Sequence, residues 1–87
     1  MPQFQKLREL LETSYAWPAI YTFKFIIHKE RELEFIQIMG LEVIEYKVRA
    51  SGQGKYLAFT FSMSFDSSEK VIEVYRKGSK IPGVIAL

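Results

Sequence analysis

The 87-residue chain contains no cysteine, which excludes disulfide bonds, thiolate metal sites and cysteine nucleophiles. It has a single histidine, His28, and a single aspartate, Asp66. A transition-metal site would therefore depend on glutamate carboxylates, which suit harder ions. A serine triad needs a histidine oriented by a carboxylate, and no serine here lies in a glycine-flanked elbow. The sequence therefore predicts a protein that is not an enzyme and has no metal and no cofactor, with His28 structural or at the surface.

Long apolar runs are also missing, and none approaches the ~20 residues that span a bilayer. Glu9 and Glu12 interrupt the apolar positions at the N-terminus, so we expect no signal peptide, no membrane partner and a cytoplasmic location. The net charge of +2 is too balanced to favour nucleic acid as the main partner. A hydrophobic content of 48% predicts one packed domain over residues 1–87, because so short a chain cannot supply two cores.

The clearest pattern in the chain is the alternation of residues 57–65. Large side chains alternate with small ones, in the order Leu57, Ala58, Phe59, Thr60, Phe61, Ser62, Met63, Ser64 and Phe65. A period of two predicts a strand with one face in a core. Residues 43–49 also alternate, so we expect a hairpin about residues 51–54 with Ala50 opposite Lys55. In that register the expected pairs are Val48 with Leu57, Tyr46 with Phe59, Ile44 with Phe61, Arg49 with Tyr56, Lys47 with Ala58 and Glu45 with Thr60.

The N-terminal segment, residues 1–14, is expected to contain a helix over residues 4–12. Its apolar residues fall at helical spacing, and they are Phe4, Leu7, Leu10 and Leu11. This helix either packs on its own domain, or moves onto a partner, or frays in solution. Pro18 then keeps Trp17 out of helical geometry.

Two elements are expected between this segment and the hairpin. The first is a strand over residues 20–27, with Tyr21, Phe23, Phe25 and Ile27 inward and Thr22, Lys24 and Ile26 outward. The second is a short helix over residues 29–39 that ends at Gly40 and has an irregular first turn. Its expected buried residues are Leu33, Phe35, Ile36 and Met39.

Two more elements are expected after the hairpin. Residues 66–69 are typical of a capping box that starts a helix, and Gly78 would end it. The expected buried stripe of this helix is Val71, Ile72, Val74 and Tyr75. A short strand over residues 84–87 follows. The order β-α-β-β-α-β predicts an α+β, ferredoxin-like plait, in which a four-stranded antiparallel sheet carries two helices on one face. The strands at 20–27 and 57–65 would be central.

Three stretches carry a resemblance to a known family. They are Leu7-Arg-Glu-Leu-Leu-Glu12, Trp17-Pro-Ala-Ile-Tyr-Thr-Phe-Lys24 and Ser51-Gly-Gln-Gly-Lys-Tyr56. In order and spacing they are similar to motifs of the YbeD-like family of small, uncharacterised bacterial proteins. The resemblance covers nearly the whole chain. It implies a ferredoxin-like fold similar to small-molecule-sensing regulatory domains of the ACT type, and it implies no established activity.

Two other classes with this fold fit poorly. Acylphosphatases use an asparagine and a glycine-rich phosphate loop, whereas this chain has no asparagine and its first strand runs into His28. RNA-recognition domains stack bases on aromatic residues of the open sheet face. Here the small residues Ala58, Thr60 and Ser62 cannot form a core, so the aromatic face of that strand must be the buried one. A weak RNA-binding domain remains the alternative function.

The open sheet face is the remaining candidate site. Basic residues at one end of a face with small residues in its centre suit a small anionic metabolite, an acidic peptide or a docked protein partner. The candidate residues are Thr22, Lys24, Lys47, Arg49, Gly54, Lys55 and Tyr56. The sequence thus predicts a regulatory or interaction module that is a monomer or a homodimer through the sheet face. An ordinary solvated face is the other interpretation.

Overall fold

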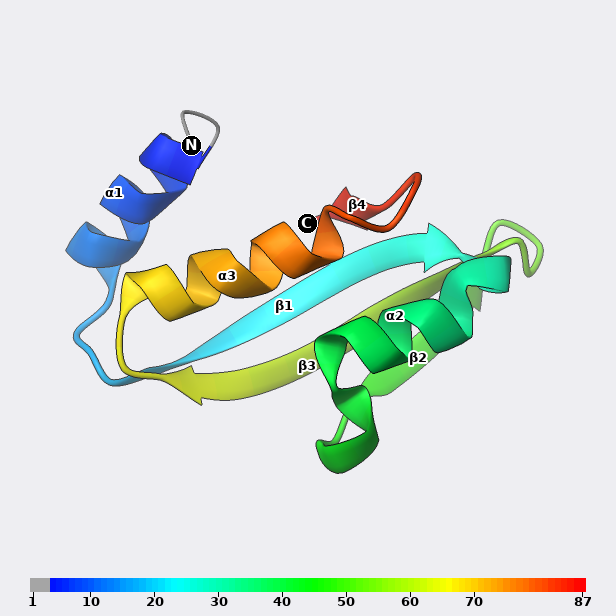
Figure 1. Cartoon of the computed structure of the whole chain (residues 1–87), viewed down its shortest axis with the longest axis horizontal. Coiled ribbons are helices and arrows are strands. Elements are labelled where there is room, and N and C mark those ends of the chain that lie inside the picture. Colours follow the sequence, from blue (N-terminus) through cyan, green and yellow to red (C-terminus); the bar gives the residue numbers. More distant parts are fainter. Residues whose placement is uncertain (1–3) are drawn as a thin grey trace.

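The computed structural model describes residues 4–87 as one sheet with helices on one of its faces (Figure 1). The elements in order are α1 (Gln5–Ser14), β1 (Ala19–His28), the 3-10 turn η2 (Lys29–Arg31), α2 (Glu32–Met39), the 3-10 turn η3 (Leu41–Val43), β2 (Lys47–Ser51), β3 (Tyr56–Phe65), α3 (Ser68–Gly78) and β4 (Ile85–Ala86). The strand order is β2-β3-β1-β4, and every pair is antiparallel. The predicted ferredoxin-like plait with β1 and β3 in the centre is confirmed. Residues 1–3 of the predicted N-terminal segment lie outside the described residues.

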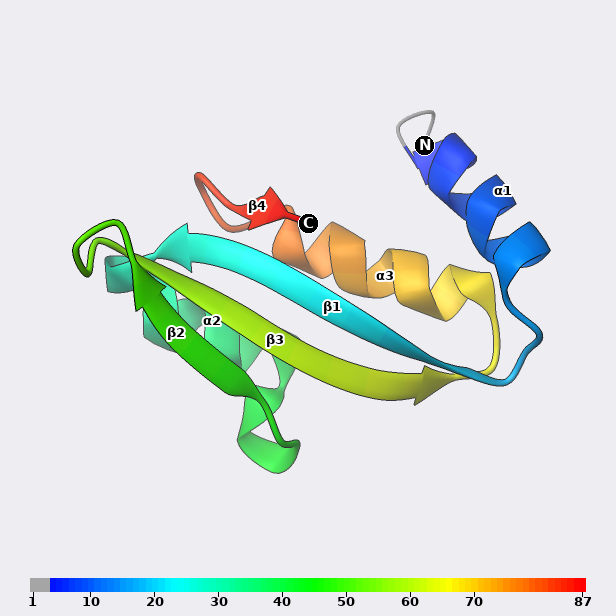
Figure 2. The same ribbon diagram turned by 180° about the vertical axis from the view of Figure 1, so that it is seen from behind.

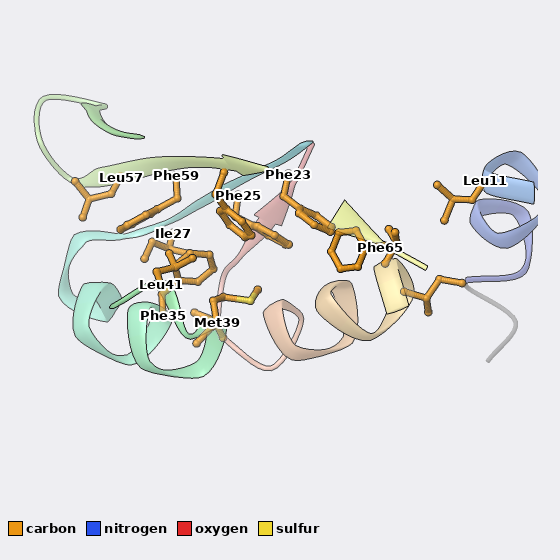
Figure 3. Close-up of a cluster of buried hydrophobic side chains, with 14 residues drawn as sticks. Leu11, Phe23, Phe25, Ile27, Phe35, Met39, Leu41, Leu57, Phe59 and Phe65 are labelled. Carbon is orange, nitrogen blue, oxygen red and sulfur yellow. The ribbon is translucent and has the colours of Figure 1, made fainter. Parts of the chain in front are cut away.

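The core lies between the central strands and the two helices, α2 and α3. Strands β1 and β3 pair along ten residues, from Ala19 opposite Phe65 to His28 opposite Tyr56. Their alternation points one face at the helices, as Figure 3 shows for the aromatic side chains. Phe35 of α2 meets Phe25 edge-on at 5.5 Å between ring centroids. The fully buried large side chains include Phe23, Phe25, Phe35, Phe59, Ile27 and Ile72. The inward residues predicted for β1 and β3 are therefore confirmed, with Tyr21 and Met63 only partly buried.

The hairpin forms, but its predicted register is wrong by two residues. Val48 lies opposite Phe59 instead of Leu57, and the last pair is Ser51 with Tyr56. The loop therefore comprises residues 52–55, closed by a hydrogen bond from Gly54 N to Ser51 O of 3.0 Å. A shift of two residues leaves every side chain on its expected face, because the side-chain period of a strand is two. Strand β2 is also shorter than expected, since the residues before Lys47 belong to η3 and a connector.

The ends of α2 and α3 differ from the prediction in two ways. Leu33 was expected in the core, but it is 74% exposed, because it lies in the first turn of α2, whose buried residues are Phe35 and Met39. The predicted capping box at residues 66–69 is absent, and the residue before α3, Ser67, makes no side-chain capping bond. The hydroxyl of Ser68 instead donates to a carboxylate oxygen of Glu12. A tertiary contact thus replaces a local one.

Gly78 ends α3, as was predicted, but it does so without turning into the left-handed region. It is the last helical residue and is buried, and the chain leaves the helix through Ser79 in right-handed geometry. A Cβ at position 78 would lie 2.7 Å from Cε1 of Phe25 and 2.9 Å from Cε of Met39. Gly78 therefore permits α3 to approach the sheet closely. Gly40, by contrast, has φ +66° and ends α2 as predicted.

Helix α1 packs on α3 of its own domain. Leu11 is buried, and the Arg8 guanidinium lies 2.9 Å from a carboxylate oxygen of Glu69. The hydrogen bond from Arg8 holds the pKa of the Glu69 carboxyl below its usual range. Leu10 was expected on the buried stripe but is 62% exposed, whereas Phe4, Leu7 and Leu11 pack against the core. Of the three predicted states of this helix, the described residues show packing on the domain itself.

The sheet has four strands at one end and two at the other. Strand β2 pairs only with residues 56–60 of β3, and β4 pairs only with Phe25 and Ile26 of β1. The remaining halves of β1 and β3, which end at Ala19 and Phe65, pair only with each other. Figure 2 shows this narrowing from the face that no helix covers. We call that uncovered face the outer face.

Candidate ligand-binding face

The outer face is built from every second residue of the strands. The even-numbered residues of β1 and β3 point away from the core, and pairing places Lys47 and Arg49 of β2 on the same side. The central strand β3 contributes only small side chains there, apart from Tyr56 at its start. The predicted members of this face all lie on it, and they are Thr22, Lys24, Lys47, Arg49, Tyr56, Ala58, Thr60, Ser62 and Ser64.

Three basic residues come together on this face, and we call them the cation cluster: Lys24, Lys47 and Arg49. Lys24 and Lys47 flank Thr60 from the two neighbouring strands. Arg49 is two residues further along β2, opposite Ala58 and on the same side of the sheet. These residues, with Val48, line a hollow of about 430 Å³. The small side chains of Ala58 and Thr60 leave its floor free of bulk, so a small ligand could approach the sheet between the three cations.

The cation cluster has no acidic partner within residues 4–87. The ion pairs of this part of the chain join Arg8 and Arg76 to glutamates of α3 and Arg31 to Glu34. All of these lie on the helices or at their ends, away from the outer face. Lys47 and Arg49 lie two residues apart on one side of β2, and Lys24 lies across β3 from them, so their like charges repel one another and cost the fold some stability. An anion with carboxylate or phosphate oxygens would relieve that repulsion and receive charge-assisted hydrogen bonds.

The other predicted site residues do not join this cluster. Thr22 lies two residues before Lys24 on β1, where its hydroxyl forms a hydrogen bond of 2.7 Å with the hydroxyl of Ser62. Gly54, Lys55 and Tyr56 lie at the hairpin end and line a second hollow of about 620 Å³. That hollow is also lined by Glu30 and Glu32, whose charges oppose anion binding. The structure therefore divides the predicted site in two, and the cation cluster is the part suited to an anion.

A contact between His28 and Tyr56 was missed at the sequence level. The two rings lie on the outer face as a pair, with centroids 4.9 Å apart. The Tyr56 ring also lies over Gly52, where a Cβ would come within 2.7 Å of it. The alternation of β1 could have revealed this contact, because continuing it by one step puts His28 on the face of Lys24. The surface role predicted for His28 is consistent with this packing.

A pair of tyrosines is the main polar contact within the core layer. The hydroxyls of Tyr21 and Tyr75 lie 2.8 Å apart. Burial, together with this hydrogen bond, raises the pKa of Tyr75 well above its usual range. The Tyr75 phenol therefore stays neutral at physiological pH. Its hydrogen bond with Tyr21 stabilises the packing of α3 on β1.

No group of three or more histidine, aspartate and glutamate side chains in residues 4–87 could hold a metal ion. None of the helices described is long and apolar enough to cross a membrane.

Comparison with known proteins gives one match. Residues 12–87 match the model of a family described as "Protein of unknown function (DUF493)". The matched region includes all four strands, α2 and α3, and so the whole outer face. No curated protein and no solved structure matches the chain.

Proposed function

The chain belongs to the family described as "Protein of unknown function (DUF493)", and because that description names no activity, we propose from the site alone that the protein is a non-enzymatic module that binds a small anionic ligand on its outer face. The observation that carries the proposal is the cation cluster of Lys24, Lys47 and Arg49. It surrounds a hollow floored by small residues and has no carboxylate partner within residues 4–87. Binding of this kind suits a regulatory role.

Each member of the cluster has its own part in this proposal. Arg49 presents a planar guanidinium that can bind a carboxylate or phosphate through two parallel hydrogen bonds. Lys24 and Lys47 act as point charges from either side of Thr60, whose hydroxyl is a further donor. The ligand would have two or more anionic groups, because three separated cations cannot all reach one carboxylate.

The test is an amide chemical-shift titration with citrate and with inorganic phosphate as probes. We expect shifts in Lys24, Lys47, Arg49 and their neighbours in β3, and larger shifts for citrate at equal concentration. Substituting Lys24→Ala together with Arg49→Ala should leave the fold intact and weaken citrate binding by about tenfold or more, since it removes two charge-assisted contacts. The variant Arg49→Lys should lose a smaller part, because it keeps the charge but not the paired hydrogen bonds.

The matched control is Lys77→Ala together with Lys80→Ala. It removes the same charge from exposed positions at the C-terminal end of α3 and leaves the outer face unchanged. Equal weakening by both double variants would show that citrate responds to net charge alone. Unchanged citrate binding in the outer-face variant would refute the site.

A protein partner on the same face and a weak RNA-binding domain are the other functions considered. RNA binding has less support, because the aromatic residues of β3 after Tyr56 lie in the core, and Tyr56 and His28 are left as the aromatic pair on the outer face. If a short RNA binds with an affinity that falls steeply with salt and does not depend on sequence, charge attraction alone explains it.

The motif resemblance supports placing the chain in the YbeD-like group of this family. The outer-face proposal agrees with the ligand-sensing role of the ACT-type domains that this resemblance implies. A cytoplasmic location is part of the same proposal, and its support is the cysteine-free composition.

A further inference from the structure

The edge of β3 beyond the end of β2 carries unused main-chain hydrogen-bonding groups. Lys24 O accepts from Leu87 N at 2.9 Å, so the even-numbered residues of β1 direct their N–H and C=O groups away from β3. Because β1 and β3 pair in this register, the odd-numbered residues of β3 direct their N–H and C=O groups toward β1, and the even-numbered residues direct theirs toward β2. Strand β2 is paired only up to Thr60. Within residues 4–87, the outward main-chain groups of Ser62 and Ser64 therefore have no partner.

The sequence along this edge is the same in both directions about Met63. It reads Phe61-Ser62-Met63-Ser64-Phe65, with aromatic residues at the ends, serines inside them and methionine in the centre. Two such strands placed antiparallel about Met63 bring each Ser62 opposite a Ser64, so that each pair exchanges two main-chain hydrogen bonds. Phe61 then meets Phe65 on the helix side, and only small hydroxyl side chains meet on the outer face.

We propose that two copies of this chain associate through residues 61–65 of β3, antiparallel about a two-fold axis at Met63, so that the sheet of one copy continues into the other. This interface is distinct from the outer face, and it leaves both cation clusters exposed on the same side of the joined sheet. Figures 1 and 2 show the edge from its two sides, with no element of the chain lying over it.

The structure leaves space for the incoming strand where β2 ends. The chain diverges from β3 before Lys47, and a hollow of about 670 Å³ lies between residues 44–47 and residues 60–62. Asp66 directly follows β3, and where the chain leaves the strand it would come beside Lys47 of the other copy, the residue paired with Thr60. Neither residue forms an ion pair within the described chain. Glu45 also lines the hollow, and Lys24 and Arg49 line the neighbouring hollow together with Lys47, so these four side chains carry a net positive charge.

The unpaired edge of β1 is a poorer match for a second copy. Its free half reads Ala19-Ile20-Tyr21-Thr22-Phe23, which in a two-fold pairing would place Ala19 opposite Phe23 and Ile20 opposite Thr22. A large residue then meets a smaller one in each of these pairs. A five-residue contact buries little surface in any case, so we expect a weak dimer that forms in the upper micromolar range.

The absence of cysteine permits a direct test by single-cysteine cross-linking. On the axis, position 63 meets itself as a non-hydrogen-bonded pair with a Cα separation of about 4.5 Å, which suits a disulfide. We expect Met63→Cys to cross-link under mild oxidation. Ser62→Cys and Ser64→Cys should each fail to cross-link alone, because each meets the other position, and should cross-link when the two variants are mixed. Equal cross-linking of all three variants alone would refute the register.

A second test uses the intact chain without cross-links, by sedimentation equilibrium over a range of concentrations. Ser64→Pro removes an outward N–H and leaves the β1–β3 ladder unchanged, since Pro is accepted where the N–H of an edge strand faces solvent. It should raise the dissociation constant about tenfold or more, because each copy loses one interchain donor. Ser64→Ala should associate as the natural chain does, and so should Thr22→Pro, which blocks the other edge. A natural chain that stays monomeric throughout, or an equal loss with Thr22→Pro, would overturn the proposal.

Discussion

Substituting Gly78→Ala is the most informative test of how α3 packs on the sheet. Alanine is the better helix former, so this change on an exposed helix would stabilise the protein by about 1 kcal/mol. Here the added Cβ would lie 2.7 Å from Cε1 and 3.1 Å from Cζ of Phe25, a ring that is 1% exposed. A third contact at 2.9 Å is with Cε of Met39, which can move aside because it ends a flexible side chain.

The magnitude follows from the balance of these two effects. The Phe25 ring cannot retreat, because Phe35 and Phe61 contact it on the other sides. Helix α3 must therefore move outward, and overpacking of this kind costs about 1–3 kcal/mol. After the gain in helix propensity of about 1 kcal/mol, we expect a net loss of up to about 2 kcal/mol. In a domain of this size, each kcal/mol of that loss lowers the melting temperature by roughly 4–8 °C.

Urea denaturation of four chains measures the effect: the natural chain, Gly78→Ala, Phe25→Leu and the double variant. Because leucine lacks the ring atoms that the new Cβ meets, the two substitutions should couple favourably by about 1 kcal/mol or more. The difference between Lys77→Ala and Lys77→Gly gives the local propensity term at an exposed neighbouring position. If Gly78→Ala stabilises the protein by as much as the difference between Lys77→Ala and Lys77→Gly, the close approach of α3 to Phe25 is refuted.

Two further predictions concern α1 and the core. Because the Arg8 hydrogen bond lowers the pKa of Glu69 in the folded protein, the stabilisation from this pair is present above the unfolded pKa and is lost as the pH falls through the lowered folded value. Acid should therefore loosen α1 first, seen as chemical-shift changes confined to α1 and the start of α3. Glu69→Gln should abolish that step, and an identical titration of the variant would contradict the assignment. In α2, Phe35→Ala should cost about 3–5 kcal/mol in urea denaturation, whereas Leu33→Ala should change stability by less than about 0.5 kcal/mol. Similar losses from both would mean that α2 presents a different face to the sheet.

The alternation of residues predicted the faces of the strands but not the register of the hairpin. Burial decides which face a residue occupies, and a shift of one residue would have exposed every phenylalanine of β3. A shift of two residues leaves the faces unchanged, so the pattern could not distinguish Val48 opposite Leu57 from Val48 opposite Phe59. The loop geometry at residues 52–55 decides between them. Both glycines of that loop have positive φ, as expected, and so does Gln53, at +59°.

The helix ends were predicted less well, because distant residues determine them. Residues 66–69 were expected to form a local cap, but Ser68 within them binds Glu12 of α1, which lies 56 residues earlier in the chain. Gly78 is the last residue of α3, as expected, but the feature that requires a glycine there is the nearby Phe25 ring. In neither case does the surrounding sequence contain the partner. Predictions from local patterns cannot anticipate such contacts.

The candidate site follows the same division. Alternation and strand order were enough to predict that one face carries Lys24, Lys47 and Arg49, and the structure confirms that these residues come together. The sequence could not show that Lys55 and Tyr56 line a different hollow. Glutamates border that hollow because η2 and α2 bring them to the hairpin end. Binding of an anion at this cluster is our proposal.

The narrowing of the sheet from four strands to two should appear in amide hydrogen exchange. Near Phe25 and Phe59 the central strands have neighbours on both sides, so amides there open only with the whole domain. Towards Phe65 only one neighbour remains, and protection should then alternate along β3. The amides of Phe61 and Met63, bonded to β1, should exchange slowly, and those of Ser62 and Ser64 should exchange quickly in a dilute sample. A single strand thus spans nearly the full range of local stability in the molecule.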